Sequence, residues 1–179
     1  MKFPYLFTPL IAVLAPLQAT ASQPQMPEPL PIQLSINQDA QQPGTTSASG
    51  CIRLRIENLR SQEGMIGIAL FTTDKGFPSK PEKAYASTGL ELKEGATCLM
   101  LENIPYGNYA LSILHDENSN QKMDKTFIGI PKEGFGTSNN PKISYGPPDF
   151  EESEFVLDRE EIALVIDMNY FNKKDFSEE

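Results

Sequence analysis

The sequence has one histidine and two cysteines, and beyond its N-terminus it has no long apolar run. One histidine cannot build a usual zinc site unaided, and two cysteines allow at most one intramolecular disulfide. Without a later apolar run, we expect no membrane span in the mature chain. Lysine and arginine form no cluster in a chain of net charge −9. Nucleic acid and anionic membranes are therefore poor candidate partners, because phosphate binding needs a concentrated positive surface.

The N-terminus has the features of a secretory signal. Lys2 precedes an apolar run over residues 3–17, and the small residues Ala19 and Ala21 mark a cleavage site. We therefore expect a signal peptide over residues 1–21, cleaved after Ala21, and a mature protein that is secreted or periplasmic. A retained N-terminal anchor is the alternative.

Composition divides the remaining chain into three parts. Residues 22–49 are rich in Pro, Gln and Ser, which predicts a flexible linker, although residues 32–36 would fit the edge of a sheet. Residues 51–171 carry the strand patterns and form the expected domain. Residues 172–179 form an acidic tail that we expect to be disordered.

Alternation of apolar and polar residues predicts an all-β domain. Residues 51–57 and 66–70 are typical of one β-hairpin, and residues 90–92 and 97–101 of a second strand pair. Residues 108–115 are apolar or small on both faces, which indicates a central strand. With further strands near the C-terminus and no periodic helix, these patterns predict an antiparallel β-sandwich with an immunoglobulin-like or transthyretin-like (prealbumin-like) Greek key topology.

The two cysteines lie on strands of this expected domain. Cys51 shares its parity with Arg53 and Arg55, and Cys98 alternates with the apolar Leu99. Strand parity therefore places both thiols on outward faces. In an exported protein such a pair favours one disulfide, so we predict a bond between Cys51 and Cys98, with two free thiols as the alternative.

A loop rich in side-chain oxygens follows the expected central strand. Its candidate calcium ligands take relative positions one, three, five, seven and nine: Asp116, Asn118, Asn120, the carbonyl of Lys122 and Asp124. Two features of the full EF-hand pattern are missing, because Gln121 replaces a glycine and Phe127 replaces the closing glutamate. We expect calcium to bind weakly, on the order of 0.1 to 1 mM, with Glu133, Asp149 or Glu151 folding back as further ligands.

Two other interpretations of this region remain open. In the first, the polar side chains of the loop cap its own backbone amides and hold no ion. In the second, His115 and Asp116 belong to a hydrolase, with the histidine as general base. No nucleophile elbow, phosphate loop or zinc cluster accompanies this pair in the sequence. We therefore expect a non-enzymatic protein with a binding or structural role at the cell envelope, in which calcium has a structural role and the ring of His115 hydrogen-bonds to the loop.

Aromatic residues set among Gly and Pro predict a second kind of site. They are Phe127, Phe135, Tyr145 and Phe150. These rings either line a recognition surface for an unknown protein, peptide or saccharide at the cell envelope, or roof one end of the sandwich. Exposure of two or more of them on one patch would favour recognition.

Three runs of sequence carry a family resemblance: residues 115–124, Gly129-Ile130-Pro131-Lys132-Glu133-Gly134-Phe135-Gly136, and Gly146-Pro147-Pro148 before Asp149-Phe150. Together they resemble the bacterial domain-of-unknown-function family 2141, and the resemblance covers about residues 51–170. It implies an exported, β-rich bacterial protein and carries no established activity. Typical members have Gly where this chain has Ser119 and Gln121, which implies a tight backbone path at these two positions.

Overall fold

The structure is a computed structural model. It describes residues 28–44, 47–93, 97–142 and 146–171. The expected signal peptide, the expected acidic tail and Tyr145 lie outside the described residues. Within these ranges no helix is long and apolar enough to cross a membrane.

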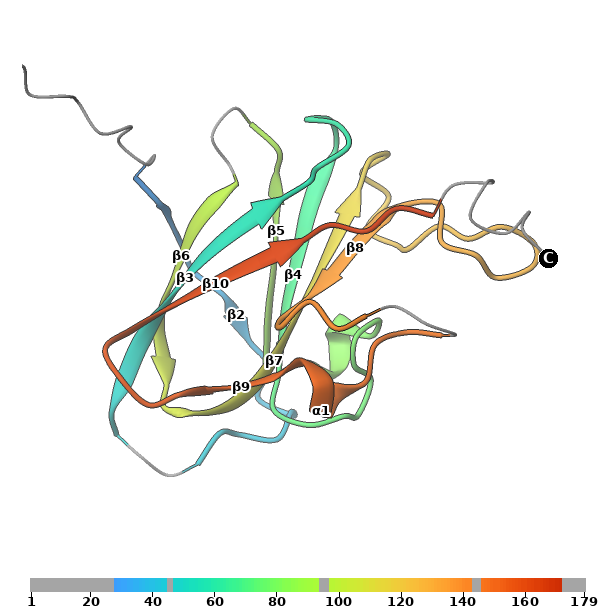
Figure 1. The fold of residues 1–179 in the computed structure, drawn as a ribbon. Helices are drawn as coiled ribbons and strands as arrows, with labels where there is room; N and C mark the ends of the chain where they lie inside the picture. Colours follow the sequence, from blue (N-terminus) through green and yellow to red (C-terminus); the bar gives the residue numbers. More distant parts are fainter. Residues whose placement is uncertain (1–27, 45–46, 94–96, 143–145, 172–179) are drawn as a thin grey trace, which may run out of the picture.

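The described residues form two β-sheets (Figure 1). A four-stranded sheet has the order β1 (Leu30–Ile32), β6 (Cys98–Pro105), β3 (Ser49–Glu57) and β10 (Glu161–Asp167). A six-stranded sheet has the order β2 (Ser35–Ile36), β5 (Ala86–Glu91), β4 (Met65–Phe71), β7 (Gly107–Asp116) and β8 (Gly134–Thr137), and β9 (Glu154–Leu157) also pairs with β7. Two short helical turns are η1 (Pro81–Lys83) and α1 (Phe150–Ser153).

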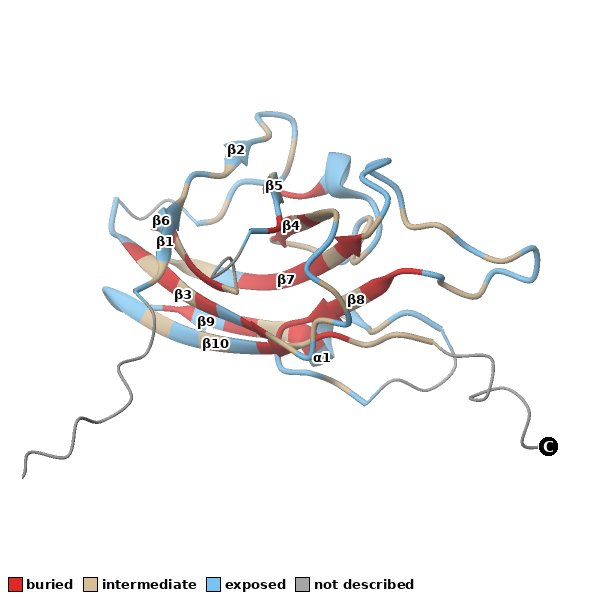
Figure 2. Ribbon diagram, turned by 90° about the horizontal axis from the view of Figure 1, so that it is seen from above, coloured by how far each residue is buried: buried red, intermediate tan, exposed pale blue. Residues whose placement is uncertain are grey.

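One apolar core joins the two sheets. Figure 2 shows the buried stretches of β3 and β7, which belong to opposite sheets. Alternate residues of the strands point into the core, and the largest aliphatic ones are fully buried: Ile52, Leu54, Ile66, Ile68, Leu70, Leu99, Leu101, Leu111, Leu157 and Ile166. Each such side chain contributes about 1.5–3 kcal/mol of transfer free energy. The all-β prediction is therefore confirmed, and the period-two pattern marks strands with one face in the core.

β7 is the central strand that the sequence predicted. It pairs antiparallel with β4 along one edge, and with β9 and then β8 along the other. Tyr109, near its start, is fully buried, and its hydroxyl donates a hydrogen bond to the carbonyl of Pro105 (2.7 Å). This bond fixes the corner at which the chain leaves β6 in one sheet and enters β7 in the other.

The two predicted hairpins are wrong. β3 and β4 lie in different sheets, and so do β5 and β6. A period-two pattern specifies which face of a strand is buried, but it does not specify whether the next strand lies beside it or across the core. The prediction of purely antiparallel sheets is also wrong, since β10 pairs parallel with β3 and β1 pairs parallel with β6.

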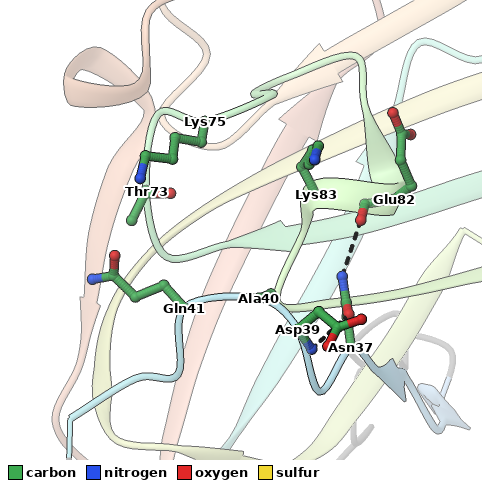
Figure 3. Close-up of a pocket in the computed structure, with 8 residues that line it drawn as sticks. All are labelled: Asn37, Asp39, Ala40, Gln41, Thr73, Lys75, Glu82 and Lys83. Atoms are coloured by element: carbon green, nitrogen blue, oxygen red, sulfur yellow. Dashed lines mark hydrogen bonds between the residues drawn. The ribbon is translucent and has the colours of Figure 1, made fainter.

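The expected linker does not hold for residues 28–44, because this segment carries β1 and β2. β1 pairs with β6 and β2 with β5, so the segment joins the edges of both sheets. The Asn37 side chain donates to the carbonyl of Glu82 (3.0 Å), and the Thr72 hydroxyl donates to the carbonyl of Gln41 (2.7 Å). Figure 3 shows the small polar hollow of about 230 Å³ beside these contacts. The segment is part of the domain.

The predicted disulfide is not formed, and Cys51 and Cys98 are free thiols. The register of β3 against β6 pairs Cys98 with Arg55, four residues along the strand from Cys51. Four residues at about 3.3 Å each separate the two positions by roughly 13 Å, whereas a disulfide needs Cα atoms within about 7 Å. Cys98 is also buried, with 5% of its surface exposed, so its expected outward position does not expose the thiol. Parity says nothing of what covers a face, and only the register decides which residues meet.

Thiol titration of the unreduced protein in denaturant should give two reactive groups per chain. Thermal melts with and without reductant should coincide, because no covalent loop restricts the unfolded chain. A protein with no reactive thiol, whose melting temperature falls on reduction, would contradict the register of β3 and β6.

Candidate functional site

A buried histidine holds the end of β7. The side chain of His115 is fully buried, its Nε2 donates to the carbonyl of Glu63 (2.9 Å), and its Nδ1 lies 2.6 Å from the hydroxyl of Tyr170. The same hydroxyl accepts the backbone N–H of Arg60 (3.2 Å) and can donate to Nδ1. Both ring nitrogens are engaged inside the protein, and neither partner belongs to the loop that we expected. His115 therefore has no nitrogen free for a substrate.

Arg60 connects this histidine to the loop between β7 and β8. This loop, residues 117–133, is called the acidic loop below, and it projects beyond the sheets (Figure 1). The guanidinium of Arg60 lies 4.5 Å from the centre of the Tyr170 ring and forms an ion pair with Glu117. The hydrogen bond from Arg60 lowers the pKa of Glu117. Arg60 also donates to the carbonyl of Lys132 (3.2 Å), so one side chain ties both ends of the acidic loop.

The predicted calcium ligands meet around the start of the acidic loop. Asp116 is 2% exposed, and its carboxylate accepts the backbone N–H groups of Asn120 (3.1 Å) and Gln121 (2.5 Å). The carboxylate of Asp124 accepts the side-chain amides of Asn118 (2.8 Å) and Asn120 (3.2 Å). Four of the five predicted residues are thus linked by hydrogen bonds. Asp116 caps backbone amides of the loop, as the alternative interpretation describes, whereas Asp124 holds side-chain amides.

The backbone of the acidic loop turns tightly at two positions that carry side chains. Ser119 and Gln121 have left-handed backbone conformations, with φ of 59° and 62°. Such a conformation costs an L residue roughly 1–2 kcal/mol, and glycine would avoid this cost. The fifth predicted residue, Lys122, donates its backbone N–H to the side chain of Asn120 (2.9 Å).

A buried glutamate lies against the acidic loop. Glu133 is 4% exposed, and its Oε2 accepts the N–H of Asp124 (3.0 Å). Its Oε1 is buried and has no hydrogen-bond partner among the described residues. Burial raises the pKa of Glu133, and the charges of Asp116 and Asp124 raise it further. Of the three acidic residues that were expected to fold back, the structure brings Glu133 to the loop, and Asp149 and Glu151 lie at α1.

The carboxylates of this region do not form a ready metal centre. In the part of the chain that the structure describes, no three His, Cys, Asp or Glu side chains form a metal-binding group. The calcium site therefore stays a prediction. An ion that binds Asp124 would have to displace the side-chain amides of Asn118 and Asn120 from its carboxylate.

A groove crosses the outer face of the six-stranded sheet and has a volume of about 1290 Å³. Its floor consists of small residues on three neighbouring strands: Gly67 and Ala69 of β4, Ser87 and Gly89 of β5, and Ser112 of β7. In the register, Gly67 pairs with Gly89, and Ala69 pairs with both Ser87 and Ser112. These pairs share the face that points away from the core. Ala69 and Ser112 are buried there, and the hydroxyl of Ser112 donates to the carbonyl of Pro78 (2.9 Å), so the sheet surface is open at Gly67 and Gly89.

Loops form the walls of the groove. One wall is the segment around η1, from Pro78 to Glu82, and the other is the acidic loop with residues 146–148. The apolar lining is aliphatic in large part: Met65, Leu114, Met123, Ile128, Ile130 and Pro131. The sequence analysis did not find this groove. Its signal was present in the small residues that alternate with Ile66, Ile68 and Leu70 on β4.

Two of the predicted aromatic residues belong to this region. Phe135 lines the groove, and its ring packs on Phe171 with centroids 5.5 Å apart. Phe127 is 100% exposed in the acidic loop, and the neighbouring Ile128, 64% exposed, lines the groove.

The other predicted aromatic residues do not join them. Phe150 packs on Phe77 in a separate apolar cluster, with ring centroids 5.7 Å apart. Tyr145 lies outside the described residues. The four predicted rings therefore do not form one patch within the described structure.

Replacing Tyr170 with Phe removes the hydroxyl between His115 and Arg60. The free energy of unfolding should fall by about 1–3 kcal/mol, because a buried ring nitrogen loses its partner. Urea denaturation measures the change. Tyr106→Phe is the control, since that ring packs half-buried against the core, and it should cost less than about 0.5 kcal/mol. Equal losses in the two variants would contradict the network.

Replacing Gln121 with Gly should raise the free energy of unfolding by about 0.5–1 kcal/mol. The variant removes left-handed strain, and this gain exceeds the added entropy of the unfolded chain. The neighbouring Lys122 is not among the left-handed residues, so Lys122→Gly should lower stability instead. Denaturation curves of both variants test the opposite signs, and a loss in both would contradict the strain argument.

Comparison with known proteins yields one family. The family model described as "Uncharacterized protein conserved in bacteria (DUF2141)" matches residues 54–164. The match begins within β3, ends within β10 and includes the acidic loop and the strands under the groove. A search of curated proteins gives no match, and a search of solved structures gives none. Because the family model matches more than half of the chain, this protein belongs to the uncharacterised bacterial family DUF2141.

Proposed function

We propose that this protein is a non-enzymatic binding module, and that it holds an extended peptide segment of a partner protein in the groove. The open floor carries the proposal. Gly67 and Gly89 lie side by side there and have no side chains, so a ligand backbone can approach the sheet closely. The volume of about 1290 Å³ exceeds the roughly 300–1000 Å³ of a small-molecule site, which favours a long ligand.

The walls of the groove favour a peptide over a saccharide. Met65 and Met123 are adaptable apolar side chains, and Ile128 presents aliphatic surface to solvent. Such surface gains free energy by covering apolar peptide side chains. It would leave the hydroxyl groups of a saccharide without hydrogen-bond partners, which is costly. A saccharide is the alternative ligand.

Charge at the rim favours an acidic peptide. Lys80, Lys122 and Lys125 line the groove and are exposed. The acidic side chains in the lining are Glu82 and Asp116, and Asp116 is buried with its carboxylate already hydrogen-bonded. In a chain of net charge −9, this local excess of lysine attracts an acidic side chain or a terminal carboxylate.

The proposal also covers where the protein acts, which is the cell envelope, and its fold, which is an immunoglobulin-like sandwich. Residues 1–21 have the pattern of a signal peptide, which supports a partner at the cell envelope. The hydrogen bond from Tyr109 to Pro105 supports an immunoglobulin-like sandwich, because a tyrosine bonded in this way marks the corner between sheets in that fold. The transthyretin-like topology is the alternative.

Gly67→Leu tests the groove. A Cβ at Gly67 would have the Cβ of Leu114 as its nearest neighbour, at 3.6 Å, so the new side chain should fill the groove without displacing the sheet. Peptides selected from a random library on the unaltered protein should bind this variant at least about tenfold more weakly, a loss of about 1.4 kcal/mol. Fluorescence anisotropy of labelled peptides measures the affinity.

The matched control is Gly44→Leu. A Cβ at Gly44 meets nothing within 4 Å, and Gly44 does not line the groove. This variant should bind the selected peptides as the unaltered protein does. Selection that yields no acidic peptides, or peptides that bind Gly67→Leu with unchanged affinity, would overturn the proposal. Binding of oligosaccharides that Gly67→Leu abolishes would support the alternative ligand.

A further inference from the structure

We propose that Asp116, Asp124 and Glu133 bind one Ca²⁺ ion at the base of the acidic loop, and that Glu133 supplies the closing ligand that the loop sequence lacks at Phe127. The proposal does not rest on the groove, because it uses other side chains and a different measurement.

The unpartnered oxygen of Glu133 is the main observation. One carboxylate oxygen holds the N–H of Asp124, and the other is buried with no hydrogen-bond partner among the described residues. A buried polar atom without a partner is costly, and a charged one more so. Buried polar groups in native proteins are nearly always satisfied, and binding of an ion is one explanation of an exception. Oε1 of Glu133 is such an exception, and it is therefore a candidate ligand for an ion.

Negative charge accumulates around this oxygen. Asp116 and Asp124 are both close enough to act on the carboxylate of Glu133. None of the ion pairs among the described residues includes Asp116, Asp124 or Glu133. Asp116 and Glu133 are buried, and a cation between these carboxylates would offset their charge, because buried carboxylates without a positive partner are unfavourable.

The chemistry of the donors favours calcium among cations. Carboxylate and carbonyl oxygens suit hard cations, and Ca²⁺ tolerates irregular and flexible coordination better than Mg²⁺. Glu133 is the last residue of the acidic loop, directly before β8, so its carboxylate can close the shell that Phe127 leaves open. In the full EF-hand pattern a bidentate glutamate has this role.

One side chain must move for the ion to bind. The carboxylate of Asp124 is held by the amides of Asn118 and Asn120, and both asparagines are exposed. Water can replace these amides at little cost, which allows Asp124 to turn toward Glu133. Asp116 has less freedom, because it is buried and holds two backbone amides. This rearrangement uses part of the binding energy, and the affinity should be on the order of 0.1 to 1 mM.

The competing explanation is a proton shared between Asp116 and Glu133. Both carboxyl groups are buried and adjacent, and one proton would remove one of their charges. The two explanations differ in their response to calcium at constant pH. An ion adds stability by mass action, whereas a shared proton leaves the protein insensitive to calcium.

Thermal melts at neutral pH in chelator and in about 5 mM CaCl₂ test the proposal. With a dissociation constant of about 0.5 mM, calcium should raise the melting temperature by about 3–6 °C. MgCl₂ at the same ionic strength should raise it less, because Mg²⁺ demands stricter geometry. Titration calorimetry with CaCl₂ alone should show saturable binding to one site.

Glu133→Gln should abolish the calcium shift and the calorimetric signal. The same variant should melt at a higher temperature than the unaltered protein in chelator, because it removes a buried charge. Asp124→Asn is the second variant, and it should also lose the calcium shift. It keeps the proposal testable if Glu133→Gln does not fold. Glu151→Gln on α1, which is exposed, should keep the shift as the control.

Identical melts of the unaltered protein in chelator and in calcium would overturn the proposal, as would a calcium shift that persists in Glu133→Gln and Asp124→Asn. Gly67→Leu separates the two proposals. It should lose peptide binding and keep the full calcium shift, so a failure of one proposal leaves the other independently measurable.

Discussion

The pairing of β7 on both of its edges is the constraint on which the rest of the structure depends. β4 occupies one edge, and β9 and β8 share the other. Tyr109 at its start fixes the corner between the sheets, Ser112 lies in the floor of the groove, and His115 and Asp116 hold its end. A strand that is hydrogen-bonded along both edges cannot shift its register without breaking both ladders, so these positions are held rigidly.

The acidic loop connects the two candidate sites. Its residues from Gln121 to Pro131 contribute to the wall of the groove, while its base carries the buried carboxylates of Asp116 and Glu133. Arg60 ties the two ends of the loop together and rests on the ring of Tyr170. The loop has few apolar core contacts of its own. Its conformation therefore depends on hydrogen bonds and charge, and a change at its base would alter the wall of the groove.

Part of the candidate site was predictable because local sequence encodes it. Side chains two residues apart along the loop, Asn118 and Asn120, both donate to Asp124, so the spacing brings predicted residues together, and an ion among them stays a prediction. Ser119 and Gln121 have left-handed conformations, at the two positions where the sequence analysis expected a tight backbone path. Glu133 was one of several candidates, and only the position of β8 selected it. The sequence analysis missed the groove because glycine, alanine and serine form its floor. Such small residues give no periodic apolar pattern in a sequence.

The sequence by itself determined that this chain forms strands, which of their faces are buried, and which strand lies at the centre. Those properties follow from the alternation of side chains along one strand. Only the tertiary structure decided which strands are neighbours, that β3 and β4 face each other across the core, and that Cys51 lies far from Cys98 along the sheet. The physical reason is that pairing and register depend on contacts between segments distant in sequence, and a period of two is satisfied equally well by many of them.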